Sequence, residues 1–305
     1  MGQVYQQPVN KTLLVRFLCE TSCEMAKDEL KPGKKLLVGG GFLDRTKAVQ
    51  VVYDNTRSLS ELQADHEEAD RRILLHSKHA SETCGRIVIQ SPDTDVAVLS
   101  VHFFSSLSCK ELWFKSGTKD KTHYIPIHSI QNKLGRAVCD VLLGLHAITG
   151  CDTTSGLSSI GKKKALKALR SRSKAPEQLE TLGNEIPPTK PTLEYCKMFI
   201  CSLYTSHKKA GTTADHVRYW MFCQNHQKNE SLPPTSDSLS HHIKRANYQA
   251  HVWKKSLCKE QDLPSSETNG WIIENGKILP SLMTKDPAPT SLKRAHHLEV
   301  QPLSL

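Results

Sequence analysis

Residues 86–95 read Arg86-Ile87-Val88-Ile89-Gln90-Ser91-Pro92-Asp93-Thr94-Asp95, and this stretch decides the fold class that the sequence predicts. Its near-continuous β-branched run is typical of a strand buried inside a parallel sheet. Ser91-Pro92 ends the strand, and the apolar residues 96–99 belong to a following helix. Further strands are predicted at 34–41, 47–53, 111–114 and 123–127, in alternation with helices up to about residue 150. The sequence therefore predicts an α/β fold, with a parallel sheet flanked by helices.

Helical periodicity continues outward from this region on both sides. Helices are predicted at 11–30, 58–80, 129–134, 136–148, 162–172, 192–206, 213–227 and 241–257. These elements suggest an N-terminal helical segment (1–33), an α/β domain (34–174), a helical region (175–262) and a loop-rich tail (263–305). The histidine pairs at 241–242 and 296–297 are expected to be solvated.

The composition favours a polyanionic partner, although an ordinary basic protein has the same balance of charges. Forty-one Lys and Arg residues against 31 Asp and Glu residues give a formal net charge of +10. The ten cysteines are scattered, and no apolar run resembles a secretory signal or a membrane span. We therefore expect reduced thiols, no membrane association, and a nuclear or cytoplasmic rather than a secreted protein.

Two acidic clusters precede residue 100. Asp93 and Asp95 follow the predicted strand 86–90 at its carboxyl end, where open α/β sheets bind ligands. Two carboxylates held this close repel one another unless a cation or a proton lies between them. The alternative is that both cap the following helix. The second cluster is Glu67, Glu68 and Asp70, which taken alone favours a solvated acidic turn offset by Arg71 and Arg72.

A third acidic position and a basic turn follow the apolar helix 136–148. Asp152 lies in a turn beside Gly150, where the alternative role is simply to end that helix. Gly161 then opens a helix whose backbone N–H groups are suited to bind a phosphate. The run 162–174 contains seven basic residues, including Lys162, Lys163, Lys164 and Lys167. It predicts contact with a nucleic-acid backbone, or otherwise a solvated face or nuclear-localisation patch.

Together these elements resemble the flap endonuclease (XPG-like) branch of the PIN-like nuclease superfamily. The similarity lies in Glu68-Ala69-Asp70, Asp93-Thr94-Asp95, Gly150-Cys151-Asp152 and the turn Ser159-Ile160-Gly161-Lys162-Lys163-Lys164-Ala165. The segments at 66–80, 91–100, 123–130 and 145–166 look more narrowly like a group of uncharacterised animal proteins with a transposon-like distribution. Those proteins carry a flap-endonuclease-like domain, and the resemblance covers about residues 34–172.

The resemblance implies a PIN-like α/β fold followed by a helix-two-turn-helix element and a helical C-terminal half. It also implies metal-dependent phosphodiester hydrolysis of nucleic acid, DNA in preference to RNA. Glu68, Asp70, Asp93, Asp95 and Asp152 would hold one or two Mg²⁺ or Mn²⁺ ions, with Asp93, Asp95 and Asp152 as the catalytic residues. Gly161, Lys162, Lys163, Lys164 and Lys167 would bind phosphates of the nucleic acid.

The start of the chain departs from the family pattern. Flap endonucleases begin with a strand that delivers a metal-binding Asp, and residues 1–5 (MGQVY) do not match it. Asp54, at the end of the strand 47–53, is the candidate replacement. The alternative is therefore a catalytically degenerate PIN-like module that binds nucleic acid or protein and has an incomplete metal site. The sequence leaves open whether the protein is an enzyme and what its oligomeric state is.

Overall fold

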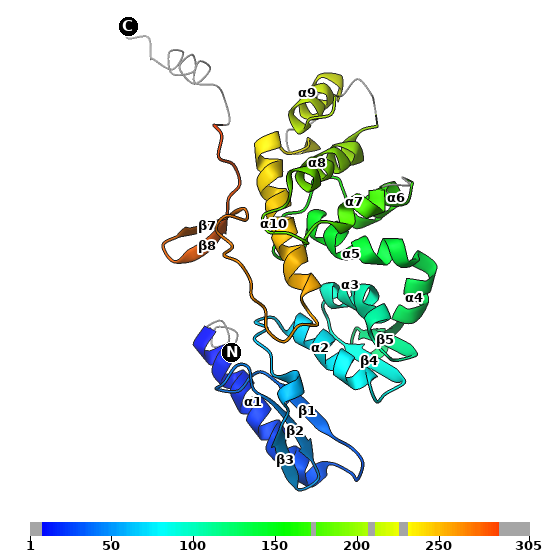
Figure 1. Cartoon of the computed structure of the whole chain (residues 1–305), viewed down its shortest axis with the longest axis vertical. Coiled ribbons are helices and arrows are strands. Elements are labelled where there is room, and N and C mark those ends of the chain that lie inside the picture. Colours follow the sequence, from blue (N-terminus) through cyan, green and yellow to red (C-terminus); the bar gives the residue numbers. More distant parts are fainter. Residues whose placement is uncertain (1–7, 172–174, 207–210, 226–230, 287–305) are drawn as a thin grey trace. The chain divides into compact units, whose positions relative to one another are not determined.

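The computed structural model describes residues 8–171, 175–206, 211–225 and 231–286, and it has a mixed α/β fold (Figure 1). The chain divides into two compact units. Unit 1 comprises Met1–Leu143 and Ala250–Leu263, and unit 2 comprises Gly144–Gln249 and Pro264–Leu305. The α/β class predicted from the sequence is therefore confirmed at this coarse level.

Unit 1 contains both sheets of the α/β part of the chain. Its elements are α1 (Pro8–Glu29), β1 (Leu36–Gly39), β2 (Ala48–Val52), β3 (Asn55–Ser58), η2 (Ser60–Leu62), α2 (Ala69–Ser81), β4 (Arg86–Gln90), α3 (Thr94–Phe103), η3 (Phe104–Ser106), β5 (Glu111–Ser116), η4 (Lys119–Lys121), β6 (His123–Pro126), α4 (Ile127–Leu134) and the greater part of α5 (Arg136–Ile148).

The first sheet has the antiparallel order β1-β2-β3 and is covered on both faces. Because side chains alternate along a strand, Val49 and Val51 of β2 face α1 and pack with Cys23. Ala48 faces the other way and joins a cluster that includes Leu75 of α2. Figure 1 shows α1 alongside this sheet.

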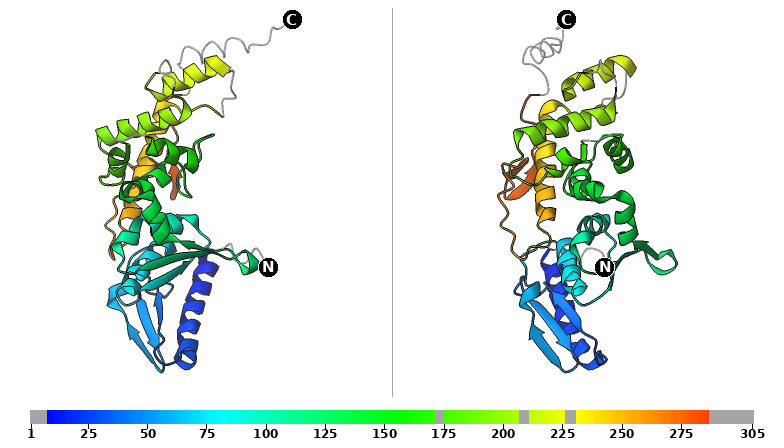
Figure 2. Two further views of the ribbon diagram at one scale, coloured as in Figure 1. Left: turned by 90° about the vertical axis from the view of Figure 1, so that its right-hand side faces the viewer. Right: turned by 45° about the vertical axis from the view of Figure 1, so that its right-hand side comes forward.

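The second sheet has the order β4-β5-β6, in which β4 and β5 are parallel and β6 is antiparallel to β5. The structure thus has two three-stranded sheets with one parallel pair instead of one parallel sheet. The short connections within β1-β2-β3 and between β5 and β6 allow only antiparallel pairing, whereas α3 provides a crossover between β4 and β5. The β5–β6 hairpin extends away from the helices of unit 1 (Figure 2).

The helix predicted at 58–80 is shorter in the structure, where only the turn η2 and then α2 from Ala69 are helical. The intervening residues are held by the chain around residue 260. The carboxylate of Asp65 accepts hydrogen bonds from the backbone N–H of Gln261 at 3.0 and 3.1 Å. The Nε2 atom of His66 lies 2.7 Å from the carbonyl oxygen of Cys258. These long-range contacts replace a first helical turn.

Unit 2 is mainly helical. It contains the end of α5, α6 (Lys162–Arg170), α7 (Ala175–Glu180), α8 (Lys190–Tyr204), α9 (Ala214–Asn225), most of α10 (Ser236–Lys254), β7 (Trp271–Glu274) and β8 (Lys277–Pro280). The sequence did not predict α7 or the β7–β8 hairpin, which lies in the region expected to be loops. The predicted helical and tail residues 172–174 and 287–305 lie outside the described residues.

Helix α10 carries buried polar side chains that connect the segments of unit 2. His242 is buried, and its Nε2 atom lies 2.8 Å from the carbonyl oxygen of Ile148. Arg245 is buried as well, and it donates hydrogen bonds to the carbonyl oxygens of Gly270 (3.1 Å) and Ser281 (2.6 Å). The expectation of a solvated residue is therefore wrong for His242. The pair at 296–297 lies outside the described residues.

Membrane-spanning segments are not found among the helices of the described ranges. None of those helices is both long enough and apolar enough to cross a lipid bilayer.

Candidate functional site

The first acidic cluster lies at the start of α2. Glu68 is the residue before the helix, and its carboxylate lies 3.6 Å from the Nε atom of Arg71. The side chain of Arg71 is 5% exposed, and its guanidinium also donates to the side-chain oxygen of Gln261. Asp70 is half-buried in the first turn of the helix. The cluster therefore places a carboxylate beside a buried arginine, which explains one role of Glu68 without a metal ion.

The second acidic cluster lies at the start of α3. Asp93 has an extended backbone, and its side-chain oxygen accepts a hydrogen bond of 2.7 Å from the backbone N–H of Asp95. This is an N-cap, the role that the sequence offered as the alternative to metal binding. Asp95 is 9% exposed in the first turn of α3. Both residues follow β4 directly, so the cluster lies at the carboxyl end of the parallel β4–β5 pair.

These carboxylates do not form a site for a divalent ion as they are placed. No three His, Cys, Asp or Glu side chains lie close enough together to hold a metal anywhere in the described ranges. Glu68, Asp70, Asp93 and Asp95 occupy two helix starts of unit 1, where Asp93 caps α3 and Glu68 pairs with Arg71. We therefore derive no catalytic role for these carboxylates with Mg²⁺ or Mn²⁺. Asp54, the candidate replacement, is exposed in the turn between β2 and β3.

Asp152 lies in unit 2, exposed in the first of two tight turns that join α5 to α6. Cys151 and Thr154 pair across the first turn, and Leu157 and Ile160 pair across the second. The hydroxyl of Thr154 fixes the first turn because it donates a 2.7 Å hydrogen bond to the carbonyl oxygen of Ala147. The order helix, two turns, helix is thus present here as a local arrangement.

Gly150 lets the chain approach itself closely at this first turn. Its φ of +107° is unfavourable for other residues, and an added Cβ would lie 2.7 Å from the Cα of Gly156. The Gly-Cys-Asp element therefore has a backbone requirement of its own, which is independent of what the carboxylate of Asp152 binds.

Helix α6 presents an exposed basic face. Gly161 is the N-cap residue and no side chain caps the helix. Lys163, Lys164 and Lys167 are exposed, and no acidic side chain lies within ion-pair distance of them among the described residues. The opposite side of the helix is packed, since Ala165 and Leu169 are fully buried. The face that carries these three lysines is therefore available to a ligand.

Lys162 differs from its neighbours. Its ammonium group donates hydrogen bonds to the carbonyl oxygens of Gly150 and, at 3.4 Å, of His146. It therefore connects the start of α6 to the end of α5, near the negative end of that helix dipole. The phosphate contact expected of Lys162 stays a prediction, and the structure shows these internal contacts.

Comparison of the chain with protein-family models, with curated proteins and with solved structures gave no match. The roles of these residues therefore rest on their geometry and chemistry.

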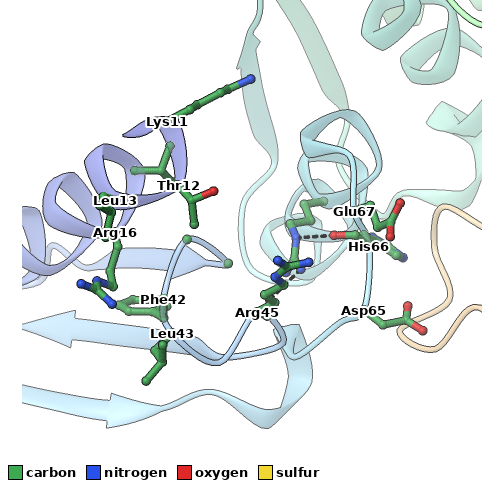
Figure 3. Close-up of a pocket in the computed structure, with 14 residues that line it drawn as sticks. Lys11, Thr12, Leu13, Arg16, Phe42, Leu43, Arg45, Asp65, His66 and Glu67 are labelled. Atoms are coloured by element: carbon green, nitrogen blue, oxygen red, sulfur yellow. Dashed lines mark hydrogen bonds between the residues drawn. The ribbon is translucent and has the colours of Figure 1, made fainter. Parts of the chain in front are cut away.

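The sequence did not indicate a cavity of about 510 Å³ in unit 1 (Figure 3). The cavity lies between α1, the loop that follows β1, and the segment before α2. It is lined by four cationic side chains, namely Lys11, Arg16, Arg45 and Arg72, and by two carboxylates, Asp65 and Glu67. These residues come from four separate segments, so no local motif could have identified the cavity.

Proposed function

We propose that the protein binds nucleic acid through the exposed basic face of α6, without a catalytic role for the carboxylates of unit 1. The observation that carries this proposal is the charge of the first turn of α6. Lysines occupy its first three positions and no acidic residue is present there. Cations at a helix N-terminus are unfavourable by about 0.3–1 kcal/mol each, so this arrangement is destabilising in the absence of an anionic ligand.

The geometry of α6 suits a phosphate backbone. Lys163 and Lys167 are one helical turn apart, and Lys164 lies three residues before Lys167, so the three ammonium groups share one side of the helix. The unpaired backbone N–H groups of the first turn add a partial positive charge beside them. Neither feature distinguishes one base from another, so we expect binding to depend on charge rather than on sequence.

For unit 1 we propose a PIN-like core. Support comes from the parallel β4–β5 pair, from α3 as its crossover, and from the acidic residues at the carboxyl end of β4. In this interpretation the protein keeps the domain organisation of a nuclease while the acidic residues cap and pair within the fold. DNA is the preferred partner, and the location of the protein is nuclear or cytoplasmic.

The test is the salt dependence of binding by the full chain to a fluorescently labelled DNA duplex of about 20 base pairs. Contacts from three or four cations predict a slope of about −2.7 to −3.6 in a plot of log affinity against log salt. Affinity should therefore fall by about 40- to 150-fold between 50 and 200 mM salt. Fluorescence anisotropy measures both quantities. A salt-independent affinity, or no binding at low salt, would contradict the proposal, and matched RNA and single-stranded probes define the preferred form.

Metal-dependent phosphodiester hydrolysis is the second candidate. The observation in its favour is that Asp93 and the buried Asp95 lie at the carboxyl end of the parallel strands, the usual position of a site in an open α/β sheet. The observation against it is that, within the described residues, no group of three His, Cys, Asp or Glu side chains is placed to hold a metal ion.

Two substitutions of Asp93 separate these candidates. Asp93→Ala removes the cap of α3 and is expected to lower the free energy of unfolding by about 1 kcal/mol, whereas Asp93→Asn keeps a capping oxygen and should change it by only a few tenths. Urea denaturation measures the difference. In parallel, the native protein is incubated with Mn²⁺ and labelled DNA, and we expect no cleavage. Cleavage that disappears in the stable Asp93→Asn variant would establish the hydrolase instead.

A further inference from the structure

Two strands of unit 1 have an outer edge that no other strand covers in the part of the chain that the structure describes. The strand β1 is at the end of the order β1-β2-β3, and β4 is at the end of the order β4-β5-β6. An edge strand presents a row of backbone N–H and C=O groups that can pair with a further strand.

Both edge strands line the same groove, which has a volume of about 490 Å³. Leu37, Val38 and Gly39 of β1 form one wall, and residues 87–90 of β4 form the other. The remaining lining comes from α2, including Ala69, Ile73 and Ser77. The groove is therefore bounded by two strand edges and by a helix with small and apolar side chains.

The groove contains little charge of its own. Among the described residues that line it there is no carboxylate, and the cationic side chain is Arg72. His76 is neutral at pH 7, because burial and, to a lesser extent, the nearby Arg72 lower its pKa to about 4. Its ring packs against Gly39, where a Cβ atom would overlap it. Apolar and backbone contacts therefore dominate the recognition that the groove can offer.

The side chains of β4 do not match its position at an edge. The run RIVIQ has the composition of a strand that is covered on both faces, yet Val88 is 50% exposed and only Ile89 is buried. In the central strand β2, by contrast, Ala48 and Val51 are fully buried. The side of β4 that carries Val88 is thus left partly uncovered by the described residues.

We propose that the groove binds an extended polypeptide segment of another protein, which adds a strand between β1 and β4. The backbone of such a segment pairs with a strand edge, and alternate apolar side chains pack against α2. The added strand covers Val88 and joins the two sheets into one.

Charge complementarity specifies one end of this partner. Arg72 lines both the groove and the adjoining cationic cavity, and its guanidinium donates to the carbonyl oxygens of Arg45 (2.8 Å), Ala64 (2.9 Å) and His66 (3.0 Å) but pairs with no carboxylate within the described ranges. Figure 3 shows Lys11, Arg16 and Arg45 around that cavity. Asp65 and Glu67 also line the cavity, so its four cationic side chains exceed its carboxylates by two. The partner is therefore an apolar strand with acidic residues at the end beside Arg72.

The experiment uses the full chain and a fluorescently labelled peptide of alternating valine and threonine that ends in two aspartates. One comparison peptide has a central proline, which cannot complete the hydrogen-bond ladder. The other has two lysines in place of the aspartates. We expect saturable binding of the first peptide and at least about tenfold weaker binding of the other two. Amide hydrogen exchange should slow in β1 and β4 when the first peptide is present.

Val88→Lys places a charge where the added strand would pack and should weaken peptide binding by about tenfold or more. Tyr124→Lys is the matched control, because Tyr124 is 55% exposed on β6 at the opposite edge of the same sheet. It should leave the affinity within about twofold. Both residues are exposed, so both variants should fold, and a thermal unfolding curve checks this.

Four results would overturn the proposal. The first is no binding of the aspartate peptide, and the second is equal binding of the proline peptide or of the Val88→Lys protein. The third is protection of β4 amides that rises with protein concentration alone, which would assign the groove to a second copy of the chain. The fourth is faster exchange of those amides after removal of residues 1–7, which would assign it to the beginning of this chain.

Discussion

Replacement of Lys163, Lys164 and Lys167 by glutamate is expected to weaken binding to duplex DNA by at least about 100-fold at 100 mM salt. Each substitution removes one phosphate contact and adds a charge that repels the backbone. The slope of log affinity against log salt should become shallower by about 2 to 3, because each lost contact contributes about 0.9. Fluorescence anisotropy over a range of salt concentrations measures both effects.

This variant is expected to fold at least as well as the native chain. Lys163 and Lys164 lie in the first turn of α6, where glutamate interacts favourably with the helix dipole. The residues that pack the helix, such as Ala165 and Leu169, are unchanged. A loss of binding therefore reports a lost contact with the nucleic acid, and circular dichroism confirms the helix content.

The matched control has the same change in net charge at three other exposed lysines of unit 2. These are Lys190 at the start of α8, Lys277 on β8 and Lys285 beyond the hairpin. If general basicity caused the binding, the control would lose as much affinity as the α6 variant. If α6 is the binding surface, the control should lose less than about tenfold. Equal losses would refute the role of α6.

The sequence predicted those elements whose pattern is local. The helices α5, α6 and α8 and the strands β2 and β4 carry their apolar periodicity within themselves. The start of α2 could not be predicted in this way. It depends on Asp65 and His66, whose partners lie about 190 residues away in the sequence at Gln261 and Cys258. The hydrophobic periodicity of the sequence near residue 60 gives no information about such distant contacts.

The β7–β8 hairpin is a different case, because its signal is present in the sequence. Asn275 and Gly276 both have positive φ values, +51° and +73°, and they lie between the runs WIIE and KILP. Asn-Gly between two apolar runs is a strong local indication of a tight hairpin. The abundance of Pro, Ser and Gly in the surrounding tail obscured it.

The sequence predicts which residue types occur at the candidate site, but it does not predict which atoms their side chains contact. The acidic residues do lie at helix starts, but a sequence cannot show whether Asp93 binds a cation or the N–H group of Asp95. Lys162 was predicted to bind phosphate, whereas its ammonium contacts the carbonyl oxygens of Gly150 and His146. Both differences have one cause: a polar side chain satisfies the nearest backbone groups first.

Asn247 on α10 illustrates the same behaviour in the core of unit 2, and its replacement is expected to have the largest effect on stability. The residue is fully buried. Its side-chain oxygen accepts a 2.7 Å hydrogen bond from the N–H of Gly183, and its side-chain nitrogen donates a 2.8 Å hydrogen bond to the carbonyl oxygen of Glu185. Only a side chain with both a donor and an acceptor satisfies this pair.

Asn247→Asp should lower the free energy of unfolding by about 3 kcal/mol or more at pH 7, since it buries a charge that faces the carbonyl oxygen of Glu185. Asn247→Leu, which removes both hydrogen bonds without introducing a charge, should cost about 2–3 kcal/mol. Urea denaturation measures both. Asn132→Asp, at an exposed position on α4, is the control and should change the stability by less than about 0.5 kcal/mol.

The pH dependence distinguishes the two Asn247 variants. Burial raises the folded-state pKa of the introduced carboxyl above its unfolded value of about 3.9, so the folded state binds more protons between those two values. Stability of Asn247→Asp relative to the native chain should therefore recover as the pH falls through the folded pKa, and the protonated carboxyl can then donate to Glu185. The leucine variant has no such group. If the loss in free energy of unfolding caused by Asn247→Asp stays constant from pH 7 to about pH 4, the side chain is solvated rather than buried.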